Sequence, residues 1–307
     1  DALLPHVARA DEIDQVSSRG YMMGYFGGGI LLAVNLVMIM VLPEVFPQLG
    51  KGLMTRLSFV TVALWWFGFT LPLLFKVKEP LRRIEEGEED LHPIRASLIR
   101  LKKTFLDLKK YRDLSLGLLA FWIYANGIGT IITMATIYGK ELNFSDTTLI
   151  GTLLMVQILA APFAMLFGWL AKKIGTKKAI YLSLVIYSLI AVAGYFLYHE
   201  WQFWVLGAAV ATVQGGSQAL SRSMIGKMMP KSKSAEFYGF FSVFEKFASI
   251  LGPFIFGVVS HLMNESRLSI ASLILFFGLG LFVLTKVNLE RGVKVASDEE
   301  AKLITVE

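Results

Sequence analysis

The sequence holds 307 residues, of which 55% are hydrophobic and 18% are charged. With a mean hydropathy of +0.58, this composition excludes an ordinary soluble domain and predicts an all-α polytopic membrane protein. There is no cysteine, which excludes disulfides and thiolate metal sites, and the four histidines fall in or beside predicted loops. We therefore expect no metal site.

Apolar runs long enough to cross a bilayer, roughly 20 residues, recur along the whole chain. Ahead of them, residues 1–20 are polar and acidic, and because the chain opens without methionine we expect its true start to lie further upstream. Eight runs can be distinguished, near residues 21–43, 53–75, 114–138, 147–171, 178–198, 202–225, 236–262 and 268–287.

The basic residues are distributed unevenly over the connections between these runs. Nearly all of the 30 Lys and Arg residues lie in alternate connections or in the two ends of the chain. By the positive-inside rule, both ends face the cytoplasm. The net charge of +6 then meets the anionic headgroups of membrane lipid, so a nucleic-acid partner is not needed.

The connection 76–113 is the longest one. It begins with the acidic run "EEGEED" and continues with apolar residues at alternating spacings of four and three, separated by Arg and Lys. This pattern predicts a basic amphipathic helix on the inner membrane surface. Its role is either to tether two helix bundles or to sense lipid. The apolar positions are Ile94, Leu98, Leu101, Phe105 and Leu108.

Two spans, a long connection and six spans match the later part of a transporter built from two six-span bundles. Four further spans would then lie ahead of Asp1, and we expect the complete protein to be a monomer. The predicted parts are 1–75, the end of the first bundle; 76–113, the linker; 114–287, the second bundle; and 288–307, a cytoplasmic tail.

Polar residues recur at similar depths inside the predicted spans. At about 1.5 Å per residue, Asn126, Gln157 and Gln214 lie about 15–18 Å inside their spans, and Glu245 and Lys246 fall near the same level. Polar groups that coincide near the midplane predict a water-accessible cavity. Glu245 is either a protonatable switch balanced by Lys246, or both residues form structural bridges between helices.

The segment "VQGGSQALSRSM" (213–224) concentrates this polarity. Gln214, Gln218 and Arg222 are spaced by four, which places them on one face of a helix. The glutamines either line the cavity or bond neighbouring helices to each other, and Arg222 either controls charge at the site or anchors the inner helix end.

Several segments resemble the vacuolar-effluxer-like branch of the major facilitator superfamily. They are "DALLPHVA", "SSRGYMMGYFGGG", "VALWWFGF", "VQGGSQALSRS" and "EFYGFFSVFEKFASILGPFIFG". The founding members of this branch are autophagy-related vacuolar amino-acid effluxers, and most bacterial members have no known substrate. The resemblance implies a twelve-span, two-bundle fold with spans five to twelve present here.

The resemblance also implies a gating loop in "GWLAKKIGTKK" (168–178). Its residues are Gly168, Lys172, Lys173, Gly175 and Lys177.

The chain departs from the branch at two positions. Lys172 stands where the loop signature has an acid that helps to latch the inner gate, and Asn126 stands where the branch has an acidic residue. Both departures remove carboxylates, so proton coupling cannot be transferred to these two positions.

We expect a secondary transporter of a small polar solute, such as an amino acid, in the cytoplasmic membrane of a bacterium. Asn126, Gln157, Gln214 and Gln218 would bind the solute, and Glu245, Lys246 and Arg222 would control charge. The chain has no GxxxxGK[ST] loop for ATP and no nucleophile–base set, so we expect neither a cofactor nor an enzyme. A flippase for lipid-linked or peptidoglycan fragments and a non-transporting receptor remain alternatives.

Overall fold

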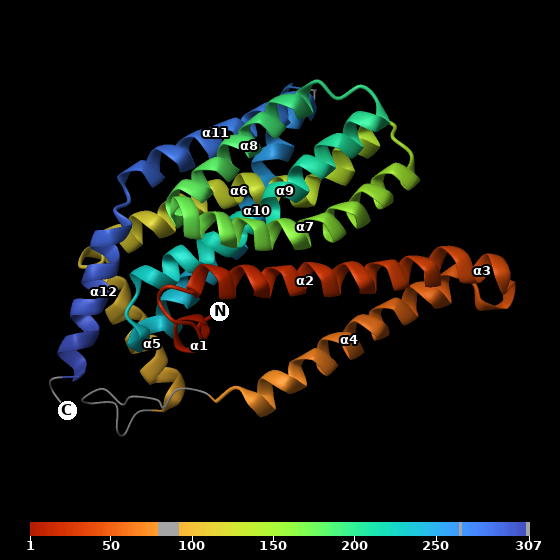
Figure 1. Ribbon diagram of the computed structural model, residues 1–307. Coiled ribbons are helices and arrows are strands. Elements are labelled where there is room, and N and C mark those ends of the chain that lie inside the picture. Colours follow the sequence, from red (N-terminus) through yellow and green to blue (C-terminus); the bar gives the residue numbers. More distant parts are fainter. Residues whose placement is uncertain (79–91, 264–265, 305–307) are drawn as a thin grey trace.

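The computed structural model describes residues 1–78, 92–263 and 266–304, and the regular structure of these residues is entirely helical (Figure 1). The longer helices are α2 (Ile13–Leu36), α4 (Lys51–Lys76), α5 (Pro93–Leu106), α6 (Arg112–Glu141), α7 (Asp146–Ile174), α8 (Thr176–Tyr195), α9 (Glu200–Met228), α10 (Ser234–Met263), α11 (Ser266–Lys286) and α12 (Leu289–Ile304). Short helices are α1 (Leu4–Val7) and α3 (Leu42–Val45), with a π-helical turn, η1 (Val37–Val41), between α2 and α3.

Local sequence fixes where these helices begin and end. The Ser145 hydroxyl accepts a hydrogen bond from the Thr148 backbone N–H and so caps the start of α7, satisfying one of the unpaired donors of a helix N-terminus. Gly175, at a φ of +94°, separates α7 from α8. A side chain is strained at that φ, so this glycine permits the tight turn between the two helices.

Seven stretches of the described chain are long and apolar enough to cross a membrane. They contain α2, α4, α6, α7, α8, α10 and α11. The remaining predicted span, 202–225, corresponds to α9, which has 29 residues but is not among the seven because its polar residues lower its hydropathy. Since α2, α7 and α8 pack around α9, its polar groups find partners in the protein, as they must where lipid offers none.

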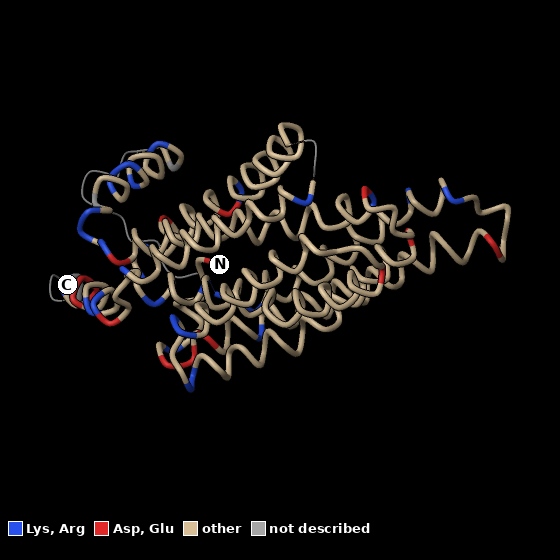
Figure 2. Tube along the Cα trace, turned by 90° about the horizontal axis from the view of Figure 1, so that it is seen from above, with Lys and Arg blue, Asp and Glu red and all other residues tan. Residues whose placement is uncertain are grey.

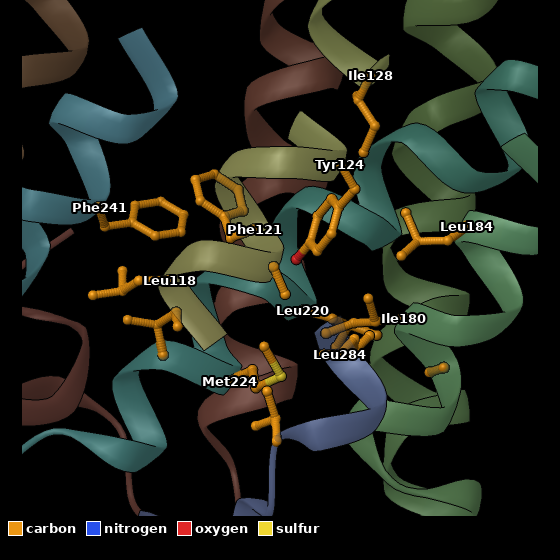
Figure 3. Close-up of a cluster of buried hydrophobic side chains, with 14 of the residues drawn as sticks. Leu118, Phe121, Tyr124, Ile128, Ile180, Leu184, Leu220, Met224, Phe241 and Leu284 are labelled. Carbon is orange, nitrogen blue, oxygen red and sulfur yellow. The ribbon is translucent and has the colours of Figure 1, made fainter. Parts of the chain in front are cut away.

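Helices α6 to α11 pack around a common apolar core, part of which is drawn in Figure 3. Phe121 on α6 stacks on Phe241 on α10 with the ring centroids 4.1 Å apart. Tyr124 points toward α9, where its hydroxyl lies 2.5 Å from that of Ser221. Close approach depends on small residues: Gly216 on α9 packs directly against the Phe167 ring on α7.

Helices α2 and α4 lie beside this bundle. Helix α2 packs along α7 and α9, whereas α4 lies on the side of α2 away from the bundle (Figure 1). Met54 is the one residue of α4 that is buried. That α2 and α4 belong to a first bundle, separate from α6 to α11, stays a prediction.

Basic residues gather at one end of the molecule, the end that holds α5, α12 and the C-terminus, which we call the basic end (Figures 1 and 2). Here α12 is held by ion pairs from Arg291 to Asp113 (2.5 Å) and from Lys110 to Glu299 (2.5 Å). The hydrogen bond from Lys110 holds the pKa of the Glu299 carboxyl below its usual range.

The predicted amphipathic helix is present as α5, and three of its apolar side chains are largely exposed, whereas Leu101 is half-buried and Leu108 follows the end of the helix. Ile94 is 67% exposed, Leu98 62% and Phe105 60%. The acidic run "EEGEED" lies outside the described residues. The exposed apolar face fits a membrane surface, and that location stays a prediction.

Replacing Gly216 by alanine tests the close packing of α9 on α7. A Cβ at this position would collide with the Phe167 ring, so we expect Gly216→Ala to lower the free energy of unfolding by about 1–3 kcal/mol. The matched control is Gly257→Ala on α10, where a Cβ would meet no atom within 4 Å. Thermal unfolding in detergent should leave the control at or above wild type, and equal unfolding temperatures for all three proteins would contradict the packing.

Candidate functional site

A cavity of about 290 Å³ lies among α6, α7, α8, α9, α10 and α11, with Leu32 of α2 at its edge. Most of its lining is apolar, and its polar side chains include Thr130, Thr152, Gln157 and Gln214. Along α9 the lining runs from Phe203, close to the start of the helix, to Gln214, near its middle. The cavity therefore occupies the half of the bundle that lies away from the basic end.

The structure brings two of the four predicted solute-binding residues to this cavity. Gln157 is half-buried and Gln214 is buried, and both line the cavity. Asn126 is 1% exposed and lies outside the lining, where its Nδ2 donates to the Trp122 carbonyl oxygen at 2.6 Å. Gln218 lies one helical turn closer to the basic end than Gln214.

A tyrosine on α2 connects the two glutamines of α9. The Tyr25 hydroxyl donates to Gln218 Oε1 at 2.8 Å and accepts from Gln214 Nε2 at 3.1 Å. Gly215 leaves room for the ring, because a Cβ there would come within 3.0 Å of Tyr25 Cε2. The glutamine stripe thus faces α2, and one of its members, Gln214, also reaches the cavity.

Arg222 continues these contacts toward the basic end. Its Nε donates to the Ser17 hydroxyl at 2.9 Å and its Nη2 to the Ser17 carbonyl oxygen at 3.0 Å. The guanidinium also lies 4.7 Å from the centre of the Tyr21 ring and pairs with Asp1 at 2.9 Å. Arg222 is therefore held by α2 and the N-terminus, and does not extend into the cavity lining.

A buried carboxylate completes the contact between α2 and α9. Asp14 is 6% exposed, and its oxygens accept from Lys227 Nζ (2.6 Å), Ser223 Oγ (2.6 Å) and Thr176 Oγ1 (2.8 Å). A buried ion pair is tolerable when further hydrogen bonds satisfy it, and here two hydroxyls do so. We call the contacts of Tyr25, Arg222 and Asp14 together the α2–α9 seam.

The predicted gating loop lies at the basic end, beside this seam. Gly168 packs against Ser18 of α2, because a Cβ there would come within 2.7 Å of the Ser18 side chain. Lys172 and Lys173 are exposed, with Lys173 Nζ 3.9 Å from the Trp169 ring centre. Lys177 donates to the carbonyl oxygens of Thr285 and Val287.

A carboxylate from α2 lies near the start of α8, next to the predicted gating loop. Asp14 of α2 accepts from Thr176, the first residue of α8. A negative charge near a helix N-terminus is favourable, since the backbone N–H groups there are partly positive.

Glu245 and Lys246 lie outside both the cavity and the seam. Glu245 is half-buried on α10 and Lys246 is exposed. Glu245 lies close enough to Tyr21 of α2 to interact with it electrostatically. Among the described residues, no group of three His, Asp or Glu side chains is placed to hold a metal ion.

Because residues 1–20 are too polar to be predicted as part of a span, the sequence does not place Asp14 and Ser18 inside the bundle. Tyr21 and Tyr25 lie in the predicted span 21–43, but no role is expected for them. A signal was present. Asp14, Ser18, Tyr21, Tyr25 and Gly28 are separated by four, three, four and three residues, which places them on one face of a helix. That face is the one that meets α7 and α9.

Residues 5–297 match the family model described as "Vacuole effluxer Atg22 like". The chain belongs to this family. The family expected from the sequence is thereby confirmed, and the described helices confirm the all-α membrane fold class, whereas the presence of eight out of twelve spans stays a prediction. The Atg22-like assignment points to a transporter and not to an enzyme.

Individual relatives place the Atg22-like chain within the major facilitator superfamily. It is 36% identical to the uncharacterized MFS-type transporter YxiO of Bacillus subtilis, over 97% of this chain and 69% of that protein. It is 26% identical to autophagy-related protein 22-1 of Penicillium rubens, over 91% of this chain and 50% of that protein. The chain thus spans about half the length of the fungal relative.

Two solved structures share the fold. The E. coli fucose:proton symporter FucP superposes with a TM-score of 0.65 at 12% identity, covering 94% of this chain and 72% of that one. A bacterial homologue of the iron transporter ferroportin, in an outward-facing state, superposes with a TM-score of 0.51 at 14% identity, covering 92% and 65%. These superpositions support the fold, and at such low identity they carry no information on the solute.

A double-mutant cycle on Asp14 and Lys227 tests the seam. Asp14→Asn and Lys227→Met should each lower the free energy of unfolding by about 1–3 kcal/mol, since each leaves a charged partner incompletely paired. The double variant should cost less than the sum of the two. Lys140→Met is the control, because its ion pair with Asp146 has the same 2.6 Å length but is exposed. Additive costs for Asp14 and Lys227 would show that they do not interact.

Proposed function

We propose that the chain forms most of a secondary active transporter for a small polar solute, with an amino acid as the first candidate, working by alternating access. The observation that carries the proposal is the division of the α2–α9 contact. On one side of Gln214 lies a cavity large enough for a small solute, and on the other side the seam holds the two helices together.

In this proposal the basic end faces the cytoplasm, in keeping with the positive-inside rule. The seam is then the closed inner gate, and the cavity lies toward the outer face of a cytoplasmic membrane. Transport requires α2, with the rest of a first bundle, to separate from α7 and α9. Rocking of two bundles around a midplane site is how such folds alternate access.

The polar side chains of the cavity set the solute chemistry. Gln157 and Gln214 offer neutral amides that both donate and accept hydrogen bonds, while the rest of the lining is mainly apolar. Such a site favours a small molecule with a polar head and an apolar remainder. Binding without flux would instead favour the receptor alternative.

Glu245 is the proposed coupling residue. It is a half-buried carboxylate near the middle of α10, where a retained charge costs at least ~2.5–3.5 kcal/mol on insertion scales. If Glu245 takes up and releases a proton as its exposure to water changes, the pH gradient is linked to movement of α10 relative to α2. Lys246 balances its charge.

The first test is uptake into vesicles of the twenty common L-amino acids, each tried in turn, with Gln157→Leu as the diagnostic variant. Losing the amide should raise the KM of the transported solute about tenfold, the value of one good polar contact. Gln48→Leu makes the same change at an exposed turn and should have no effect. An unchanged KM for Gln157→Leu would remove this residue from the binding site.

The second test concerns coupling. Glu245→Gln should abolish accumulation driven by a pH gradient but preserve exchange of solute across the membrane, because a neutral amide cannot carry the proton. Glu141→Gln, at the exposed end of α6, serves as the control. If Glu245→Gln still accumulates solute with normal pH dependence, Glu245 is structural and coupling lies elsewhere.

A further inference from the structure

We propose that Tyr25 couples occupation of the cavity to opening of the inner gate, by competing with the solute for the amides of α9. The inference rests on the proposed transport function and adds a positioning residue to it. Tyr25 was not among the residues singled out from the sequence.

Tyr25 lies between the cavity and the rest of the seam. Its hydroxyl is shared by Gln214 and Gln218, and Gln214 also lines the cavity. One turn further along α2, a Cβ at Gly28 would lie 3.6 Å from Nε2 of Gln157, the other cavity amide. Tyr25 therefore lies where the cavity ends and the seam begins.

The Tyr25 hydroxyl has the same hydrogen-bonding functions as the head of a polar solute. A phenol hydroxyl has one donor and accepts through its oxygen, and here it uses both functions on α9. A solute head that both donates and accepts, such as a zwitterion or a primary amide, offers the same functions to Gln214, which lines the cavity. Its binding there replaces the Tyr25 hydroxyl as the partner of the Gln214 amide.

Displacement of the Tyr25 hydroxyl removes a hydrogen bond between α2 and α9. Tyr25 belongs to α2 and the glutamines to α9, so the exchange removes a tie between the two helices that close the gate. Arg222 and Asp14 remain as the ties nearer the basic end. A solute in the cavity thus weakens the inner gate on the side of the cavity. It therefore binds the protein with an open gate better than the protein with a closed gate.

Ring packing explains why a tyrosine fits here. A Cβ at Gly215 would lie 3.0 Å from Tyr25 Cε2, 2.8 Å from Ala164 Cβ and 3.1 Å from the Ala160 carbonyl oxygen. The glycine thus lets the ring rest on the α9 backbone beside α7. Tyr25→Phe keeps this packing and removes the hydroxyl alone.

The test uses a single cysteine as a reporter, which the absence of native cysteine from this chain allows. Ala219→Cys places it at a fully buried position of the seam, where the Ala219 carbonyl oxygen accepts from Ser17 at 2.7 Å. In nanodiscs, Tyr25→Phe should raise the rate of maleimide labelling at least three- to tenfold, because the lost hydroxyl makes two neutral hydrogen bonds to α9 and one alone is worth about that factor. Tyr181→Phe is the matched control, because its hydroxyl ties α8 to α11, and it should label at the wild-type rate.

A second variant tests the same contact from the other helix, in case Tyr25→Phe does not fold. Gln218→Leu removes the partner amide and should raise labelling similarly, and combining it with Tyr25→Phe should add nothing further. Labelling of Tyr25→Phe at the wild-type rate would overturn the proposal, and so would a double variant that labels faster than either single one.

The labelling experiment is repeated with each of the twenty common amino acids added in turn as a probe. The amino acid that wild type transports should raise its labelling rate, should fail to raise that of Tyr25→Phe further, and should show a KM about three- to tenfold lower in Tyr25→Phe. An unchanged KM with a solute response like that of wild type would contradict competition. If wild type transports none of them, the amino-acid proposal fails, whereas labelling without solute still decides whether Tyr25 ties the gate.

Discussion

The structure depends on a constraint that lipid imposes on α9. A helix that carries two glutamines, three serines, an arginine and a lysine in its second half cannot face hydrocarbon, which offers no hydrogen bonds. Those groups must find partners inside the protein. Ser221 meets Tyr124 of α6, while Gln214, Gln218, Arg222 and Lys227 turn to α2.

The same constraint explains why a transporter can use this contact as a gate. Apolar helices associate in lipid mainly through packing, and side-chain hydrogen bonds between helices add further fixed contacts. The seam aligns Asp14 with Lys227 and Tyr25 with the glutamines. Beyond Gln214 the lining is mainly apolar and leaves a cavity. The α2–α9 contact is thus closed from Gln214 toward the basic end, whereas the cavity beyond Gln214 lies among α6 to α11.

Much of the fold could be predicted from the sequence, because apolar length and charge alternation are strong signals. Every predicted span corresponds to a long helix, although α2 begins at Ile13, well before the predicted start of the first span. The difference has a physical reason. Asp14, Ser17 and Ser18 lower the local hydropathy, and the hydrogen bonds that allow Asp14 and Ser17 to be buried come from partners on α8 and α9, far away in the sequence.

The candidate site was less predictable. Periodicity correctly placed Gln214, Gln218 and Arg222 on one face, but it cannot say what the face meets. Both interpretations of the glutamines hold in part, since Gln214 bonds to Tyr25 and also lines the cavity. Depth along a helix grouped Asn126 with Gln157, yet Asn126 turns away from the cavity lining, because depth carries no information on direction.

The central claim is that α2 and α9 must separate for solute to reach the basic end. A disulfide between cysteines introduced at Ser17 and Ala219 would fix the seam, since the Ser17 hydroxyl lies 2.7 Å from the Ala219 carbonyl oxygen. Uptake should fall to background when this cross-link forms and recover when a reductant breaks it. Each single cysteine variant should be insensitive to oxidation. Undiminished uptake by the cross-linked protein would contradict the account.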